Sequence, residues 1–287
     1  MHIRRLDAVA TVLAAALILT FAHPAAAQQR PLVTEDPESI GAGRILIEGG
    51  LDFAHDQFYP VSGLKGDLWR IPTLGFSFGL SSIAELQIDG GFFDYLSISE
   101  RHKAPLSSLV AVIGDSTHAP EDIFIGTKVR LVAETESRPA IGFRFSTRLP
   151  NASNESGLGT DSFDFYSSLL GAKTVQSVRF VGNIGVGILA DPTSGNRQND
   201  VLTYGMSLAR AITQQAEFVA ELNGRVSTRS GDAFPGTETS GLAKVGGRYT
   251  TGPLRIDAGL FFGLTSVDPT VGFTAGFTYV FDAFKVP

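Results

Sequence analysis

The chain has 287 residues, of which 43% are hydrophobic and 18% are charged, so it is long and apolar enough for one large folded domain. It contains no cysteine, which excludes a disulfide scaffold, thiolate metal ligands and a thiol nucleophile. The formal net charge of −6 gives no electrostatic basis for nucleic-acid binding. Its 32 glycines and 21 phenylalanines, with two methionines and one tryptophan, favour β structure over helices.

Residues 1–27 have the organisation of a secretory signal peptide. Two arginines, Arg4 and Arg5, precede an uncharged apolar run from Ala8 to Ala22, and three alanines follow at 25–27. This pattern predicts cleavage after Ala27. The alternative is an uncleaved membrane anchor, but His23 and Pro24 interrupt the stretch and small residues end it. The pattern is typical of a protein exported to a bacterial envelope.

The rest of the chain is built from segments in which apolar and polar residues alternate. Between 140 and 148, for example, Ile141, Phe143 and Phe145 alternate with glycine, serine and arginine, which is the period of a strand with one apolar face. Pro72 disturbs the alternation in the second segment, since proline cannot donate a ladder hydrogen bond. The predicted strands are 44–55, 66–80, 83–99, 121–134, 140–148, 161–174, 178–189, 199–211, 216–227, 238–250, 254–264 and 269–281.

The connections between these segments alternate in length. Those at 56–65, 100–120 and 149–160 are long, whereas those at 81–82, 135–139, 175–177, 212–215 and 251–253 are short. Outer-membrane barrels show this asymmetry, together with an even number of strands. We therefore predict an all-β fold, an antiparallel up-and-down transmembrane β-barrel of about twelve strands. Its predicted parts are a periplasmic N-terminal segment (28–43), the barrel (44–281) and a C-terminal extension (282–287), with both termini in the periplasm.

The chemistry of the two faces favours a membrane barrel over a soluble sandwich, which periodicity alone leaves open. The apolar face is rich in Phe, Leu, Ile and Val, as lipid contact requires, and the polar face would then line a lumen. The predicted lumen charges are Glu48, Asp52, Glu85, Asp89, Glu134, Asp164, Glu217, Glu221 and Asp257 against Lys128, Arg130, Arg144, Arg148, Arg179, Arg225, Lys244, Arg248 and Arg255.

These acids and bases nearly balance, which argues against a strongly ion-selective pore. Acids predominate on the first and third strands, and bases on the fourth and fifth, so an acidic wall should face a basic one. Two interpretations remain open. Either the charges pair with each other and simply fill the lumen, or they orient a polar solute that passes through it. Four aromatic residues, Phe93, Tyr95, Phe124 and Tyr166, are also expected on the lumen side.

Several short motifs resemble those of an outer-membrane family. They are Pro31–Pro37 with Gly41–Gly43, the strand Asp122–Lys128, Leu158–Asp161 and Asn183–Gly185. On these motifs the chain resembles the β-barrel family named after the putative MetA pathway of phenol degradation. The resemblance implies an outer-membrane barrel that transports small, often aromatic compounds, and it supplies no binding residues. The last strand also resembles an insertion signal, with Phe273, Phe277, Tyr279 and Phe281 on one face, although six residues follow it.

No motif predicts catalysis, a cofactor or a metal. Gly75–Gly79 matches G-x-S-x-G but lies inside a strand, and Gly185–Ala190 matches a dinucleotide motif but precedes a turn at Asp191–Asn196. The histidines of the mature chain, His55, His102 and His118, lack metal-ligand spacing and are predicted at or in external loops.

The leading hypothesis is a passive channel for small solutes, with hydrophobic or aromatic compounds as the favoured class, in contact with outer-membrane lipid and lipopolysaccharide. One alternative is a lipid-acting enzyme, for which His55 is the sole candidate base and no serine partner is identifiable. The other is a structural or partner-binding barrel that acts through the loops 100–120 and 149–160.

Overall fold

The structure, a computed structural model, describes residues 30–285, so the predicted signal peptide lies outside the described part. Apart from a short 3-10 turn at Asn154–Ser156, the regular elements are all strands. Within residues 30–285 no helix is long and apolar enough to cross a membrane. The strands are β1 Arg44–Tyr59, β2 Leu64–Gly79, β3 Ala84–Gly91, β4 Asp94–Arg101, β5 Ser116–Ala119, β6 Ile123–Val132, β7 Ala140–Leu149, β8 Asp164–Val175, β9 Val178–Ala190, β10 Gln198–Ala211, β11 Ala216–Ser227, β12 Ser240–Thr251, β13 Leu254–Gly263 and β14 Val271–Asp282.

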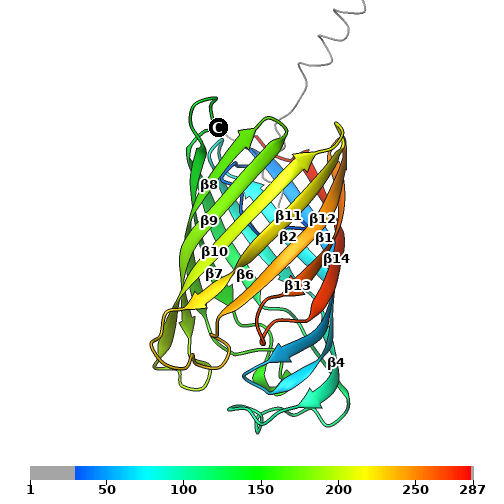
Figure 1. Cartoon of the computed structure of the whole chain (residues 1–287), viewed down its shortest axis with the longest axis vertical. Coiled ribbons are helices and arrows are strands. Elements are labelled where there is room, and N and C mark those ends of the chain that lie inside the picture. The colour runs from blue at the N-terminus through cyan, green and yellow to red at the C-terminus, as the bar shows by residue number, and fades with distance from the viewer. Residues whose placement is uncertain (1–29, 286–287) are drawn as a thin grey trace, which may run out of the picture.

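The strands form a closed antiparallel barrel (Figure 1). Each wall strand pairs with its neighbours in the chain, and β1 closes the sheet by pairing with both β2 and β14. The wall consists of twelve strands, since β4 and β5 pair beyond it on one side of β2. The predicted fold is therefore confirmed. Closure leaves the wall without a free edge, so its backbone groups are paired within the sheet.

The predicted strands agree with the observed ones, with two differences. The predicted strand 83–99 is divided into β3 and β4 at Phe92–Phe93, and the connection predicted at 100–120 contains the short strand β5. β2 spans the break between β3 and β4, because its first half pairs with β4 and its second half with β3. The connection predicted at 56–65 is only 60–63, since β1 and β2 continue further than the alternation indicates.

At Pro72, β2 changes which of its residues face inward. In β2 the buried side chains are Leu64 and Leu68 before Pro72, but Thr73 and Ser77 after it. The pairing between β1 and β2 is correspondingly irregular between Gly50 and Asp52. A shift of one residue moves every following side chain to the opposite face. The alternation predicted to be disturbed at Pro72 is thus shifted there, so that the residues after Pro72 point to the opposite side of the sheet from those expected.

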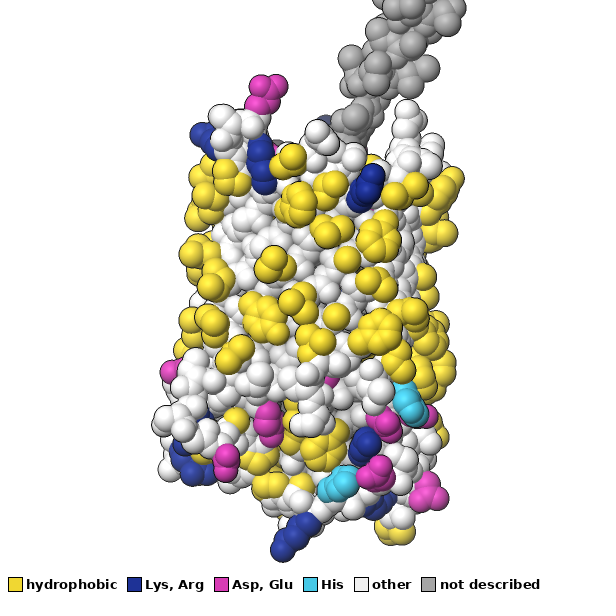
Figure 2. Space-filling model, in the orientation of Figure 1, with side chains coloured by type: hydrophobic (Ala, Val, Ile, Leu, Met, Phe, Trp, Pro, Cys, Tyr) yellow, Lys and Arg dark blue, Asp and Glu magenta, His cyan; other side chains and the backbone are white. Residues whose placement is uncertain are grey.

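The barrel carries apolar side chains outside and charged ones inside. Ile184 in the middle of β9 is 57% exposed, whereas Lys128 in β6 is 1% exposed. Figure 2 shows apolar side chains spread over the wall, with charged and histidine side chains mostly near the two ends. A water-soluble barrel would have the reverse arrangement, so this exterior is suited to lipid.

The two ends of the barrel differ. The start of β1 pairs with the end of β14, Arg44 opposite Asp282, so the first strand begins and the last strand ends at the same end of the barrel, here called the terminal end. The longer connections lie at the other, here called the loop end, where β4 and β5 project beyond the wall (Figure 1). An apolar cluster closes part of the loop end, formed by Ala54, Leu64, Leu68, Leu96 and Phe261.

An Ile184→Arg substitution should destabilise the barrel, because Ile184 lies on the exposed face of a mid-wall strand. Arginine on the lipid face near the membrane midplane costs about 2–4 kcal/mol. We expect a lower free energy of unfolding in lipid vesicles, measured by urea titration, and less of the heat-modifiable folded species. Ile184→Val is the control for lost volume. Equal stability of the arginine variant and the control would show that this face does not contact lipid.

Candidate functional site

Residues 30–40 run through the lumen, and we call them the lumen segment. They contact strands around the whole wall, including β1, β3, β6, β9, β11 and β14. The beginning of the described chain, blue in Figure 1, accordingly lies within the barrel. The sequence predicts a periplasmic segment over 28–43, separate from the barrel. The structure instead places residues 30–40 against inward-facing side chains.

The centre of this contact is a buried group of charges around Lys128. Its Nζ lies 3.1 Å from Glu85 and 3.3 Å from Glu35 of the lumen segment. Glu35 also lies 2.9 Å from Arg144 Nε, and the side chains of Glu35, Glu85 and Lys128 are all at most 7% exposed. Buried charges are stable only when paired. Glu35 therefore supplies a counter-charge that the wall requires at this point.

Two further acids of the lumen segment pair with the wall nearer the terminal end. Asp36 accepts a hydrogen bond of 2.7 Å from Arg179 Nη2, and Glu38 contacts Arg130. Arg179 also donates to Glu134, which follows β6 at the terminal end. Burial raises the pKa of Glu134, but hydrogen bonds from Thr174 and Arg179 together outweigh it, so that pKa lies below its ordinary value. This carboxylate thus stays charged beside Arg179 at neutral pH.

The other half of the lumen segment binds acidic and hydroxyl groups. Arg30 lies 3.6 Å from Asp257 and donates hydrogen bonds to Thr73 and Thr274. The backbone N–H of Val33 donates to Glu221 at 2.8 Å. The lumen segment therefore places Arg30 beside acidic groups of the wall, and its three acids beside basic groups. The segment and the wall are complementary in charge.

Glycines in the wall make room for the segment. A Cβ on Gly142 would lie 2.9 Å from Pro37, and a Cβ on Gly205 would lie 2.8 Å from Thr34 Oγ1. Those on Gly50 and Gly276 would lie within 2.6 Å of the Arg30 guanidinium. These separations are shorter than ordinary van der Waals contact, so larger residues would displace the segment. The wall is shaped to hold this segment.

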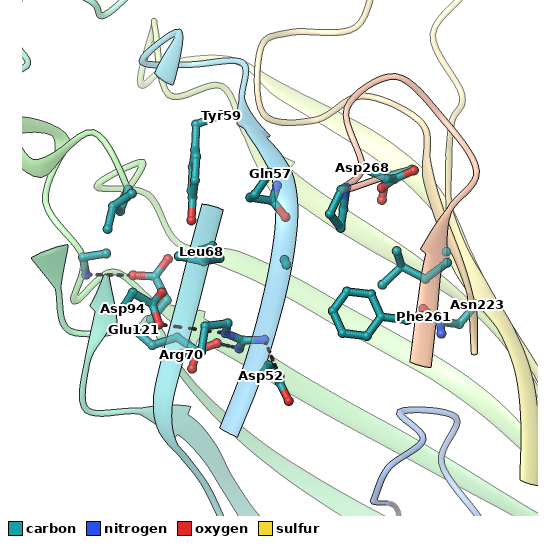
Figure 3. A pocket seen from close by; sticks show the side chains of 18 of the residues that line it. Asp52, Gln57, Tyr59, Leu68, Arg70, Asp94, Glu121, Asn223, Phe261 and Asp268 are labelled. Carbon is teal, nitrogen blue, oxygen red and sulfur yellow. Dashed lines mark hydrogen bonds and ion pairs between the residues drawn. The ribbon is translucent and has the colours of Figure 1, made fainter. Parts of the chain in front are cut away.

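Two adjoining cavities remain beside the segment. The outer cavity, about 410 Å³, lies towards the loop end, and the inner cavity, about 340 Å³, is lined partly by Arg30–Val33. Asp52, Arg70, Glu121, Phe124 and Lys244 line both, so the cavities adjoin at Arg70. Figure 3 shows Arg70 joined by dashed lines to neighbouring carboxylates, with Tyr59, Gln57, Phe261 and Asp268 around the outer cavity. A volume near 400 Å³ is that of a small-molecule site.

The predicted lumen charges lie on inward-facing positions of the wall, except Glu134, which follows β6. Glu85, Asp89 and Glu48 face the lumen segment or the inner cavity, and Arg148 joins Asp164 at 2.6 Å. The acidic and basic strands pair directly, Glu85 with Lys128 and Asp89 with Arg144, and Glu35 of the lumen segment contacts the same two bases. The remaining predicted groups pair along the opposite wall: Glu217 with Arg248 and Arg255, Glu221 with Lys244, and Arg225 with the carbonyls of Gly236 and Glu238.

Sequence reasoning missed several lumen charges. Arg30, Glu35, Asp36 and Glu38 precede the first strand, and Arg70 immediately precedes the irregular part of β2. The available signal was the acidic run Glu35–Glu38 in a chain whose fourth and fifth strands are rich in bases.

Two of the four predicted lumen aromatics lie on the outer face. Phe93 and Tyr95 are 44% and 38% exposed, and Phe93 stacks on His118 at 5.2 Å between ring centroids. The cause is the break between β3 and β4, which reverses the alternation after Gly91. Phe124 lines both cavities and lies 6.1 Å from the ring of Tyr166.

The candidate base for lipid hydrolysis has only carboxylate partners. His55 Nδ1 lies 2.7 Å from Asp67, and Nε2 lies 3.7 Å from Asp56. No hydroxyl contacts the imidazole among the interactions within residues 30–285. In the same part of the chain no group of His, Asp and Glu side chains has the geometry of a metal site.

The fold is similar to that of solved outer-membrane proteins. The COG4313 outer membrane channel from Pseudomonas putida F1 superposes with a TM-score of 0.60 at 14% identity, over 86% of this chain and 98% of that one. The translocator domain of the autotransporter NalP from Neisseria meningitidis gives 0.49 at 13% identity, over 83% and 88% of the two chains. The Pseudomonas putida toluene transporter TodX gives 0.38 at 11% identity, over 87% and 92%.

No family model and no curated protein matches the sequence. At these identities the first superposition supports the fold alone, and the other two carry no argument about function. The chain is thus a β-barrel similar to bacterial outer-membrane proteins, and the resemblance to the phenol-degradation family stays a prediction.

The position of the lumen segment can be tested by cross-linking, since the chain has no native cysteine. A Cβ on Gly205 would lie 3.4 Å from Thr34 Cβ, close to the 3.5–4.5 Å spacing of disulfides. We expect Thr34→Cys with Gly205→Cys to form an intramolecular disulfide on oxidation, detected by mass spectrometry. Thr34→Cys with Met206→Cys is the control, because Met206 is 68% exposed on the outer face. Equal cross-linking of both pairs would contradict the lumen position.

Proposed function

We propose that the protein is a channel of the bacterial outer membrane that carries small solutes, and that the lumen segment controls its opening. The observation that carries the proposal is the segment itself, held by charge pairs across a barrel with an apolar exterior. The similar Pseudomonas putida fold is an outer membrane channel, which supports this choice. In the proposed orientation the terminal end faces the periplasm.

Small amphiphilic solutes fit the outer cavity best. Its wall combines apolar side chains, among them Leu68, Phe124 and Phe261, with carboxylates and guanidinium groups. Such a lining is typical of small-molecule sites, where a few polar groups orient an otherwise apolar ligand. Solutes with an aromatic or aliphatic body and one polar group are therefore the proposed class.

We propose transport rather than catalysis. Nucleophilic hydrolysis needs a base within hydrogen-bond reach of a hydroxyl. His55 instead lies between two carboxylates on the outside of the barrel, with its side chain 48% exposed. This arrangement supports a surface charge cluster better than an active site.

The orientation predicts which connections are accessible on cells. A protease-cleavable tag inserted between 102 and 115, at the loop end, should be cut on intact cells. A tag between 212 and 215, at the terminal end, should be cut only after the outer membrane is permeabilised. Cutting of both tags on intact cells would contradict the topology.

Gating by the lumen segment predicts that fixing it closes the channel. The oxidised Thr34→Cys, Gly205→Cys variant should remain at the lowest conductance in planar bilayers, and reduction should restore wild-type openings. Conversely, Glu35→Gln with Asp36→Asn and Glu38→Gln removes the acids that pair with the basic wall. We expect this variant to spend more time at high conductance and to admit larger solutes into liposomes.

The matched control neutralises acids outside the lumen, Glu100→Gln with Glu136→Gln, and should conduct like the wild type. The proposal fails if the oxidised and reduced cysteine variants conduct equally. It also fails if folded wild-type protein passes neither ions nor small solutes.

A further inference from the structure

Arg70 faces three carboxylates at the junction of the two cavities. Its Nη1 lies 3.2 Å from Asp52, its Nε lies 3.9 Å from Asp94, and its Nη2 contacts Glu121. These carboxylates come from β1, from the start of β4 and from the connection before β6. Figure 3 shows them gathered around the one guanidinium. A single positive charge thus meets three negative ones.

Two other acids of the outer cavity, Asp122 and Asp268, have ion-pair or hydrogen-bond partners other than Arg70. Asp122 pairs with Arg148 at 2.8 Å and accepts two backbone N–H groups. Asp268 accepts hydrogen bonds from the Thr265 hydroxyl at 2.6 Å and from the backbone of Gly241 at 2.9 Å. The excess negative charge is therefore concentrated around Arg70.

The remaining bases of the outer cavity do not offset this excess. Arg148 is shared between Asp122 and Asp164. Lys244 lies 3.9 Å from Glu221, its acidic partner on the next strand. Neither forms an ion pair with the carboxylates around Arg70.

The carboxylates around Arg70 are only partly compensated. Asp94 is 8% exposed and lines the outer cavity, its Oδ1 accepts no hydrogen bond, and its ion pair with Arg70 is long, at 3.9 Å. Asp52 Oδ1 and Glu121 Oε2 also accept no hydrogen bond, since Arg70 contacts the other oxygen of each carboxylate. Buried carboxylates that share one cation remain costly, and a second cation entering the cavity would lower that cost.

The group also lies where the two cavities adjoin. Asp52, Arg70 and Glu121 line both cavities, as do Phe124 and Lys244, so a solute that moved from the outer to the inner cavity would pass beside these side chains. Rings of carboxylates at such constrictions favour cations and repel anions. Leu68 and Phe261 line the outer cavity nearby and offer contact to an apolar body.

We propose that Asp52, Asp94 and Glu121 around Arg70 make the outer lumen selective for positively charged solutes, with organic ammonium compounds as the preferred class. This inference rests on the proposed channel function and adds the charge of the solute. It differs from the near balance predicted from the strands, because that balance counts the charges of the whole wall, whereas three carboxylates surround the one guanidinium of Arg70.

The first test is the reversal potential of the full-length wild-type protein in planar bilayers under a KCl gradient. We expect a reversal potential of the sign that shows selectivity for K⁺ over Cl⁻. Asp94→Asn with Glu121→Gln should move it towards zero, whereas Glu100→Gln, which changes an exposed acid on the outer surface, should not. A wild-type channel that is anion-selective or unselective overturns the proposal.

The second test measures binding and does not depend on conduction. Calorimetry compares 2-phenylethylammonium with 2-phenylethanol, which has a similar body without the charge. One additional charge-assisted hydrogen bond corresponds to about tenfold tighter binding of the ammonium, and the double variant should abolish that preference. Equal binding of the two probes to the wild type overturns the proposal. A silent barrel that still prefers the ammonium contradicts the channel function and supports the charged site.

Discussion

The structure depends on the requirement that charges in an inside-out barrel be neutralised within the lumen. The exterior is apolar, so the side chains of Lys128, Arg144 and Arg179 have nowhere else to point. Part of their neutralisation comes from Glu35 and Asp36, which belong to no strand. Because a buried charge without a partner is costly, the bases of the wall favour the position of the segment in the lumen. The same charged side chains of the wall therefore both line the lumen and bind the segment that fills it.

The fold was predictable because every wall strand alternates between lipid and lumen. That constraint repeats at each strand, so errors of a few residues at the ends did not alter the number of strands. It fails where a strand breaks. Phe93 and Tyr95 were assigned to the wrong face and Arg70 was missed, because the alternation shifts after Gly91 and around Pro72. When the residues before and after a break are equally hydrophobic, the sequence does not show that the inward-facing and outward-facing positions have exchanged by one residue.

The lumen segment was not predictable by the same reasoning, because an irregular segment has no periodicity. Its signal was electrostatic: bases predominate on the fourth and fifth strands, and Glu35, Asp36 and Glu38 precede the first strand. The inward glycines carry the complementary signal. Gly142 and Gly205 lie where the segment approaches the backbone of the wall, but many wall glycines have no such partner. Recognising this contact required the three-dimensional arrangement.

The type of contact also determines how readily the segment can leave. Most of its specific contacts are ion pairs and hydrogen bonds, such as Glu35 with Arg144 and Val33 with Glu221. A lumen that admits water can replace hydrogen bonds of this kind at a modest net free-energy cost, about 0.5–1.5 kcal/mol for a typical one. An apolar plug would instead expose its whole buried surface to water on leaving, at roughly 25 cal/mol for each Å². A segment held by polar contacts is therefore suited to reversible displacement, with the deeply buried pair of Glu35 and Lys128 as its strongest hold.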